Sequence, residues 1–163
     1  MAKQPGSSGT PATVALTKAG LAFTIHTYDH DSAAASFGLE SANALGLPVE
    51  QVFKTLLADI DGSLVVGIVP VHRKLDLKAL AASVGGKRAA MADPAIAERS
   101  SGYVVGGISP IGQKRALTTV IDDSAQSFDT VYVSGGRRGF DLGLSPSDLA
   151  TITNAIFATI ARD

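Results

Sequence analysis

Two apolar segments joined by a two-residue turn constrain the fold of this chain more than any other feature. Residues Val52–Ile60 and Leu64–Val71 are strongly apolar, and the Asp61-Gly62 pair between them is typical of a tight β-hairpin. A hairpin with one face in water would alternate polar and apolar residues, whereas these strands are apolar almost throughout. Both faces of the hairpin are therefore expected to be covered, as in the centre of a sheet.

The remaining chain predicts helices and short strands around this hairpin. Capping residues, three of them followed directly by Pro, mark four helix starts: Thr10, Asp76, Asp93 and Ser145. In the last helix, an apolar residue recurs at helical spacing as far as Ile160, which predicts one buried face over that whole length. Shorter strands are expected at residues 21–27, 88–91, 117–121, 130–133 and 141–144. The sequence thus predicts one mixed α and β domain, residues 10–163, after a flexible N-terminus, residues 1–9.

Length and composition exclude several classes of protein. The 163 residues suit one domain with one core, and the 18% of charged residues is normal for a globular chain. The absence of cysteine excludes disulfides, thiolate metal sites and a cysteine nucleophile. No apolar run approaches the roughly 20 residues of a membrane span, so no membrane partner is expected. Residues Met1–Thr10 lack an apolar signal core, which favours a cytoplasmic protein.

Positive charge is concentrated in the middle of the chain. The net charge is −1, yet residues 54–138 hold 11 of the 14 Lys and Arg and 8 of the 15 Asp and Glu. This distribution is compatible with a face for a polyanion such as RNA, and equally with an ordinary solvated surface. The residues concerned are Lys74, Lys78, Lys87, Arg88, Lys114, Arg115, Arg137 and Arg138.

A glycine-rich stretch, Ser100–Arg115, is the clearest candidate for a binding loop. It carries four glycines, which permit positive φ and close approach of the backbone to a ligand. The alternative interpretation is a buried strand, a turn and a second strand. The stretch is not a phosphate-binding P-loop, because Gln113-Lys114 follows Gly112 where that motif requires Lys and then Ser or Thr.

Single residues suggest chemistry less strongly. Lys54 shares a strand face with apolar residues, so its amine must reach solvent, form an ion pair or point into an anion-binding cavity. A metal site at His26, Asp29, His30 and Asp31 lacks a third ligand placed by spacing, and His72 is expected at the surface. No Gly-x-Ser-x-Gly motif is present, so a hydrolase here would depend on positioned water or on a group of its own substrate.

Taken in order, the motifs resemble the YbaK-like aminoacyl-tRNA deacylases, which are related to the editing domain of bacterial prolyl-tRNA synthetases. The resemblance spans about residues 10–163 and is nearest to the branch that clears cysteine from the proline tRNA. The matching segments are residues 25–31, 37–38, 52–57, 75–78, 91–94, 102–114 and 133–139. Gly-Gly-Ile-Ser-Pro-Ile-Gly-Gln, at residues 106–113, and Phe-Lys-Thr-Leu, at residues 53–56, are the most specific of them.

This resemblance implies an α+β fold: a single domain with a mixed, partly closed β-sheet flanked by helices. It implies hydrolysis of the ester at the tRNA 3′ end with no cofactor and no metal. The family lysine falls on Lys54, expected to hold a phosphate or ribose oxygen, and Gly106 and Gly107 are expected to donate N–H groups to the oxyanion. The implied substrate-binding residues are Tyr28, Phe37, Ser109, Arg137 and Asp141.

In the cysteine-clearing branch, the substrate thiol attacks its own carbonyl, so the enzyme supplies no nucleophile. The implied partners are aminoacylated tRNA and prolyl-tRNA synthetase. Two alternatives remain open at this point: a non-catalytic RNA- or nucleotide-binding module, and a deacylase for another small amino acid such as alanine.

Overall fold

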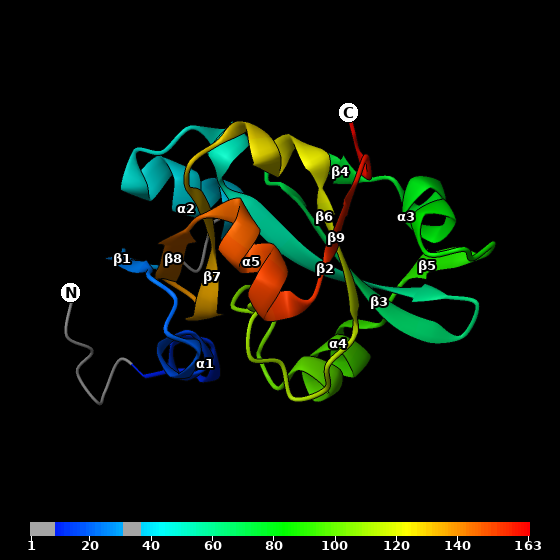
Figure 1. Ribbon diagram of the computed structural model, residues 1–163, viewed down its shortest axis with the longest axis horizontal. Helices are drawn as coiled ribbons and strands as arrows, with labels where there is room; N and C mark the ends of the chain where they lie inside the picture. The colour runs from blue at the N-terminus through cyan, green and yellow to red at the C-terminus, as the bar shows by residue number, and fades with distance from the viewer. Residues whose placement is uncertain (1–8, 31–36) are drawn as a thin grey trace.

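The computed structural model describes residues 9–30 and 37–163, so the expectation for the N-terminus lies almost wholly outside the described residues. Figure 1 shows helices arranged around a central twisted sheet. The α-helices are α1 (Pro11–Ala19), α2 (Phe37–Leu45), α3 (Leu77–Ser83), α4 (Pro94–Ser101) and α5 (Pro146–Thr153), with short 3-10 turns η2 (Val49–Gln51) and η3 (Asp123–Ser127).

The strands of the described residues form three hydrogen-bonded groups. The five-stranded sheet has the order β5-β2-β3-β6-β9, the three-stranded sheet β1-β8-β7, and a short pair joins β10 to β4. Their bounds are β1 (Thr24–Thr27), β2 (Phe53–Ile60), β3 (Ser63–Pro70), β4 (Lys74–Leu75), β5 (Ala89–Met91), β6 (Thr118–Asp122), β7 (Val131–Arg137), β8 (Phe140–Leu144), β9 (Ile156–Ala158) and β10 (Ala161–Arg162).

The central hairpin is confirmed. β2 and β3 pair antiparallel from Phe53↔Pro70 to Ile60↔Ser63, and Asp61 at the turn takes a positive φ of 52°. Both faces are covered: Val66 and Ile68 of β3 pack in the main core, whereas Val65 and Val69 pack in a second core. This double burial explains why the strands lack the alternation of a half-exposed sheet.

The sheet is partly closed, as the resemblance implied, and the fold is α+β. β3, β6 and β9 pair in parallel, whereas β2, β3 and β5 pair antiparallel, so the central sheet is mixed. An isolated parallel bridge, Val52↔Tyr132, connects the start of β2 to β7 in the three-stranded sheet. The β7–β8 hairpin therefore stands beside the first half of β2, where the pocket described below lies.

The predicted helix starts are confirmed, and their caps show why. The side chains of Thr10, Asp76, Asp93 and Ser145 accept hydrogen bonds from backbone N–H groups in the first turns of their helices. Gly20 and Gly102 end α1 and α4 in the left-handed conformation.

The expectation that the last helix continues to Ile160 is wrong. Helix α5 ends at Thr153 because Asn154 adopts the left-handed conformation, with φ 53° and ψ 42°. The chain then becomes strand β9, where Ile156 is 49% exposed and pairs with Val120. β-branched residues at 156 and 160 favour this extended path beside β6 as well as they favour a helix.

One further expectation needs adjustment, and one alternative is excluded. The strand expected from residue 21 begins only at Thr24, because Leu21 donates its N–H to the Leu16 carbonyl in the cap of α1. The segment Ser100–Arg115 contains no strand. After the end of α4 it is an irregular loop, closed by hydrogen bonds from Lys114 N–H to Ser101 O and from Arg115 N–H to Ser100 O.

Candidate active site

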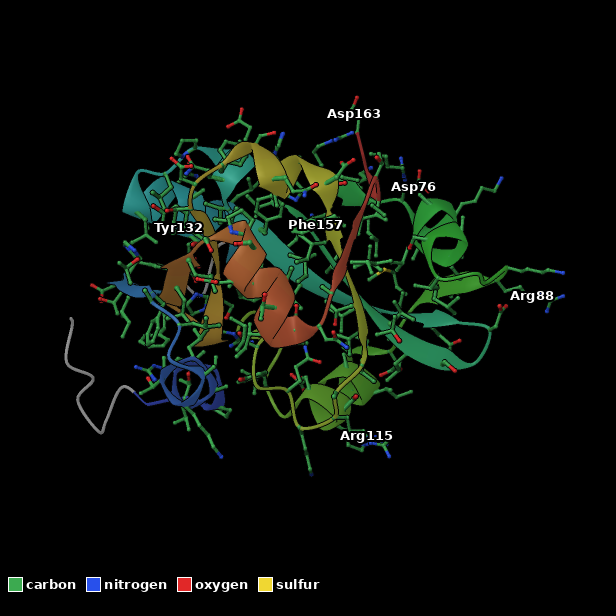
Figure 2. All side chains as sticks on the ribbon, in the orientation of Figure 1. Asp76, Arg88, Arg115, Tyr132, Phe157 and Asp163 are labelled. Carbon is green, nitrogen blue, oxygen red and sulfur yellow. The ribbon has the colours of Figure 1, made fainter. Side chains whose placement is uncertain are left out.

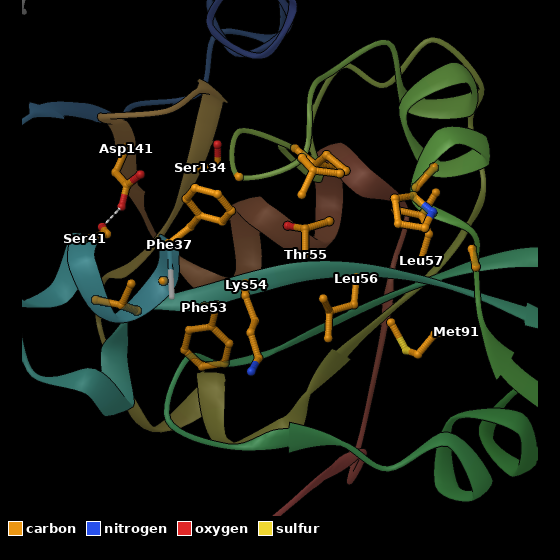
Figure 3. Close-up of a pocket in the computed structure, with 18 of the residues that line it drawn as sticks. Phe37, Ser41, Phe53, Lys54, Thr55, Leu56, Leu57, Met91, Ser134 and Asp141 are labelled. Atoms are coloured by element: carbon orange, nitrogen blue, oxygen red, sulfur yellow. Dashed lines mark hydrogen bonds between the residues drawn. The ribbon is translucent and has the colours of Figure 1, made fainter. Parts of the chain in front are cut away.

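A pocket of about 380 Å³ lies along the first half of β2 (Figure 3). Its walls come from α2, the segment leading into α4, the glycine-rich loop and the β7–β8 hairpin. It brings together residues that are far apart in the sequence and that were expected at one site: Tyr28, Phe37, Lys54, Gly106 and Asp141.

The edge of β2 explains why this place is open. β5 pairs with β2 only from Ala58 to Ile60, and Val52 forms the bridge to β7. Between these contacts, the edge of Phe53–Leu57 opposite β3 has no neighbouring strand among the described residues. Because this edge is open, consecutive residues from both faces of β2 line the pocket.

Asp141 provides a buried carboxyl group at the polar end of the pocket. It is 5% exposed, it lies on β8, and its Oδ2 accepts a hydrogen bond from the Ser41 hydroxyl of α2. Burial raises the pKa of Asp141 to about 6, although the Ser41 hydrogen bond acts in the opposite direction. Burial, and next the charge of Asp141, raise the pKa of Tyr28 as well. Asp141, Ser41 and Tyr28 together form a polar cluster that can accept a hydrogen bond from a donor group on a ligand.

Ser41 was not singled out from the sequence. A signal existed, because Ser41 follows Phe37 by four residues and such pairs share one face of a helix. Both residues line the pocket.

In the glycine-rich loop, the two expected oxyanion donors differ. Gly107 donates its N–H to Val104 O at 2.8 Å, so this group is already used within the loop. Gly106 lines the pocket with a φ of 89°, and its N–H makes no hydrogen bond within the part of the chain that the structure describes. Gly106 is therefore the better candidate for a free donor at this loop.

Arg138 fixes this loop, a role that the sequence did not indicate. Its Nε and Nη2 atoms donate to Val105 O at 2.9 and 2.7 Å, and its guanidinium lies over the Phe37 ring at 5.0 Å. On the other side of the loop, Glu98 accepts the Val105 N–H at 2.7 Å. The loop, α2 and the β7–β8 hairpin are thus joined at one point.

Lys54 is half-buried and lines the pocket, and desolvation lowers its pKa. No ion pair to Lys54 occurs among the described residues. In Figure 3 its side chain leaves β2 on the side opposite to Thr55, whereas Thr55, Phe37 and Asp141 share the other side. The amine and the Asp141 carboxyl therefore lie on opposite sides of the open edge.

Two expected substrate-binding residues lie outside the lining of the pocket. Ser109 is fully buried, and its hydroxyl accepts the Ile111 N–H at 3.2 Å. Arg137 is exposed, and its guanidinium lies over the Phe140 ring at 4.1 Å. Both residues shape the segments around the pocket without facing its interior.

The histidines have partners other than a metal. His26 forms a hydrogen bond with the Thr24 hydroxyl, and His30 Nδ1 lies 2.8 Å from Glu40 Oε1. Within residues 9–30 and 37–163, no group of three or more His, Asp or Glu side chains is arranged to hold a metal ion. Asp31, the fourth residue of the suggested cluster, lies outside the described residues.

The basic residues are exposed but come from separate elements. Figure 2 shows Arg88 just before the start of β5 and Arg115 near α4, at different margins of the molecule. His72 is exposed, as expected. In the described part of the chain, no helix has the length and apolar character needed to cross a membrane.

Comparison with known proteins agrees with this geometry. The model of the aminoacyl-tRNA editing domain matches residues 32–152, which is most of the chain. This chain belongs to the aminoacyl-tRNA editing domain family. The family that the sequence motifs suggested, and with it the enzyme class of aminoacyl-tRNA deacylases, is thereby confirmed.

Individual relatives of this editing-domain protein support the same assignment. A protein of Enterococcus faecalis, EbsC, named as a candidate Cys-tRNA(Pro)/Cys-tRNA(Cys) deacylase, is 37% identical over 121 residues, 73% of each chain. A crystal structure of a hypothetical protein superposes with a TM-score of 0.84 at 23% identity, covering 94% of this chain and 100% of the other. A structure described as a candidate trans-editing enzyme for prolyl tRNA synthetase gives 0.80 at 24% identity, covering 94% and 96%. These two structures share the fold.

Proposed function

We propose that this protein hydrolyses Cys-tRNA(Pro), releasing cysteine that has been attached to the proline tRNA. The observation that carries this proposal is a pocket with an unpaired backbone donor at Gly106 and a buried carboxyl at Asp141 but with neither a histidine base nor a cysteine nucleophile. None of the lining residues in the described chain is a histidine, and the sequence contains no cysteine. A substrate that supplies its own nucleophile suits such a pocket.

The proposed reaction has two steps. The cysteine sulfur attacks the ester carbonyl carbon, the bond to the ribose 3′ oxygen breaks, and that oxygen takes the thiol proton. The products are tRNA with a free 3′ hydroxyl and a four-membered cyclic thioester, which water opens to cysteine. Water is consumed overall, so the reaction class is a hydrolase and not a lyase.

Backbone and charge supply the stabilisation in this proposal. Gly106 lines the pocket and its N–H is unpaired among the described residues, and in this proposal that N–H donates to the carbonyl oxygen as negative charge develops on it. Lys54, with a half-buried and unpaired amine across the β2 edge, holds a terminal phosphate or ribose oxygen of the tRNA. Its charge positions the RNA, and it is not a general base.

The experiment is a deacylation assay with purified protein and a panel of tRNAs carrying cysteine, alanine, serine or proline. Cys-tRNA(Pro) is expected to lose its amino acid fastest, whereas cysteine ethylated on sulfur resists release because it has no thiol. Faster release of alanine than of cysteine would replace the proposed substrate with Ala-tRNA. Tight RNA binding with no release of any amino acid would instead establish a non-catalytic binding module.

We also propose that prolyl-tRNA synthetase delivers the tRNA. The exposed basic residues are dispersed over separate elements, and such surfaces bind RNA weakly and in a salt-sensitive way. A partner that holds the tRNA body would raise the local concentration of the 3′ end. Adding the synthetase should therefore increase the deacylation rate at limiting enzyme, and an unchanged rate would contradict this part of the proposal.

A further inference from the structure

The buried hydroxyl group of Thr55 lacks a partner within the pocket. Its Oγ1 atom is almost wholly buried and makes no hydrogen bond within the described residues. Thr55 lines the pocket, and Figure 3 shows its side chain on the same side of β2 as Phe37, Ser134 and Asp141. Buried hydroxyl groups are nearly always hydrogen-bonded, so an unpaired one inside a pocket indicates a group that a ligand completes.

The main chain of Thr55 also faces the pocket. Along an antiparallel strand, the N–H and C=O of alternate residues point to opposite edges. Val52 O accepts a hydrogen bond from Val71 on the β3 side, whereas Leu57 O accepts from Ala92 on the β5 side. By this alternation, both polar backbone groups of Thr55 point to the open edge, where the described residues supply no neighbouring strand.

An aminoacyl ester carries the hydrogen-bonding groups that complement the N–H and C=O of Thr55. Its α-amino group donates, its ester carbonyl accepts, and the N–Cα–C unit between them has the same geometry as one residue of a strand. Two residues that face each other in an antiparallel sheet exchange two hydrogen bonds in this way. Extended peptides use the same pattern when they add to a sheet edge.

We propose that Thr55 binds the main chain of the aminoacyl group, which pairs with the open edge of β2 as a single added residue. The α-amino group donates to Thr55 C=O and to Thr55 Oγ1, and the Thr55 N–H donates to the ester carbonyl. This inference rests on the proposed function and adds to it the residue that recognises what all amino acids share. Asp141 and Ser41 then remain free to contact the substrate side chain at the polar end of the pocket.

The first test uses the isosteric substitution Thr55→Val, which removes the hydroxyl and keeps a β-branched side chain. With cysteinyl-tRNA, kcat/KM is expected to fall at least tenfold, whereas Thr55→Ser keeps most of the activity. With 3-mercaptopropionyl-tRNA, which lacks the α-amino group, Thr55→Val is expected to change kcat/KM less than twofold. Thr118→Val, an exposed threonine of β6 outside the pocket, is the matched control. Equal losses on both substrates, or no loss on either, would overturn the role of the hydroxyl.

The second test does not depend on turnover. The Thr55 amide resonance is followed by NMR while 3′-amino-3′-deoxyadenosine carrying an amide-linked L-serine is added to the full-length protein. A downfield shift of the Thr55 amide proton is expected, and it should be smaller with the analogue that lacks the α-amino group. An unmoved Thr55 resonance at saturating ligand overturns the pairing. Failure of the proposed function has a different signature: a shifted Thr55 resonance together with no release of amino acid from any tRNA.

Discussion

Arg138 holds the glycine-rich loop by donating from its Nε and Nη2 atoms to the carbonyl oxygen of Val105, at 2.9 and 2.7 Å. The next residue along the chain is Gly106, which lines the pocket and whose N–H is unpaired among the described residues. The same guanidinium lies over Phe37 on α2. One exposed side chain thus fixes the orientation of a backbone donor from outside the pocket.

Replacing Arg138 by alanine is expected to lower kcat about tenfold, which corresponds to about 1.4 kcal/mol of lost transition-state stabilisation. The loss should be in kcat more than in KM, because the free loop presents the Gly106 N–H in many orientations. Global stability should change by less than about 1 kcal/mol, since the side chain is exposed. Steady-state kinetics and urea unfolding measure the two effects.

Chemical rescue provides the control for Arg138. Methylguanidine added to the Arg138→Ala variant should restore part of kcat, because it can occupy the space between Val105 O and Phe37. Methylammonium at the same concentration should not, because it lacks the planar pair of donors. Rescue by both cations, or by neither, would contradict the positioning role.

The two loop glycines should respond differently to alanine. A Cβ at Gly107 would lie 2.7 Å from the Arg137 Cα, a backbone atom that cannot move aside. A Cβ at Gly106 would instead meet the side chains of Arg138 and Phe37, although the residue also has a positive φ of 89°. Gly107→Ala is therefore expected to destabilise the fold by about 2–3 kcal/mol. Gly106→Ala should cost about 1 kcal/mol in stability, mostly from its backbone conformation.

Thermal unfolding and single-turnover deacylation distinguish these two variants. At a temperature where both are folded, Gly106→Ala should lose more activity than Gly107→Ala, because a Cβ at position 106 disfavours the positive φ that presents the unpaired N–H of this pocket residue. A larger activity loss in folded Gly107→Ala would mean that the Gly107 N–H leaves Val104 and becomes the donor during the reaction.

Asp141 should make the stability of the fold depend on pH. Its pKa in the folded state is about 6, above the ordinary value of 3.8 for an aspartate carboxyl, so the folded protein binds a proton more tightly than the unfolded chain. The stabilisation of the protonated form is present below pH 3.8 and is lost as the pH rises to 6. This difference in pKa between the folded and unfolded states corresponds to about 3 kcal/mol.

Asp141→Asn removes this titration while it keeps a side chain of similar shape. Urea unfolding at pH values from 4 to 7 should show the variant gaining stability relative to the parent protein as the pH rises, with little change above pH 7. Ser41→Ala is the companion variant: without its hydrogen bond the Asp141 pKa should rise further, since that bond lowers it. A constant difference between Asp141→Asn and the parent protein over this range would show that the carboxyl is solvated.

The features that were predictable from the sequence are those set by local residues. Caps such as Thr10 and Asp93 act within one helical turn, and the Asp61-Gly62 turn fixes the register of its own hairpin. The end of α5 was not predictable in this way. Residues 149–160 keep a helical spacing of apolar side chains, but the left-handed Asn154 and parallel pairing with β6 place Ile156 in a strand.

The pocket shows the same limit of prediction from local sequence. Lys54, Tyr28 and Asp141 were expected at one site from the order of motifs, whereas the role of Thr55 depends on where β5 stops along β2. Strand length is a property of the assembled sheet, and Met91 pairs with Ala58 and no further. Likewise, whether Gly106 or Gly107 keeps a free N–H depends on a turn hydrogen bond to Val104 that the residue types do not specify.

Lys54→Ala is expected to abolish the release of cysteine from Cys-tRNA(Pro), by at least a hundredfold in kcat/KM, while the fold stays intact. The amine is half-buried and desolvation lowers its pKa. Removing it therefore removes the free-energy cost of desolvating a charge and should not destabilise the protein.

Lys54→Arg retains the charge and should keep measurable activity. Lys18→Ala, which removes an exposed charge of α1 outside the pocket, is the matched control and should be nearly as active as the parent protein. Because the proposed role is to hold the RNA, the loss should be much smaller on a cysteinyl ester that carries no nucleotide. Equal losses on both substrates would instead place the Lys54 amine in the chemistry of the ester itself.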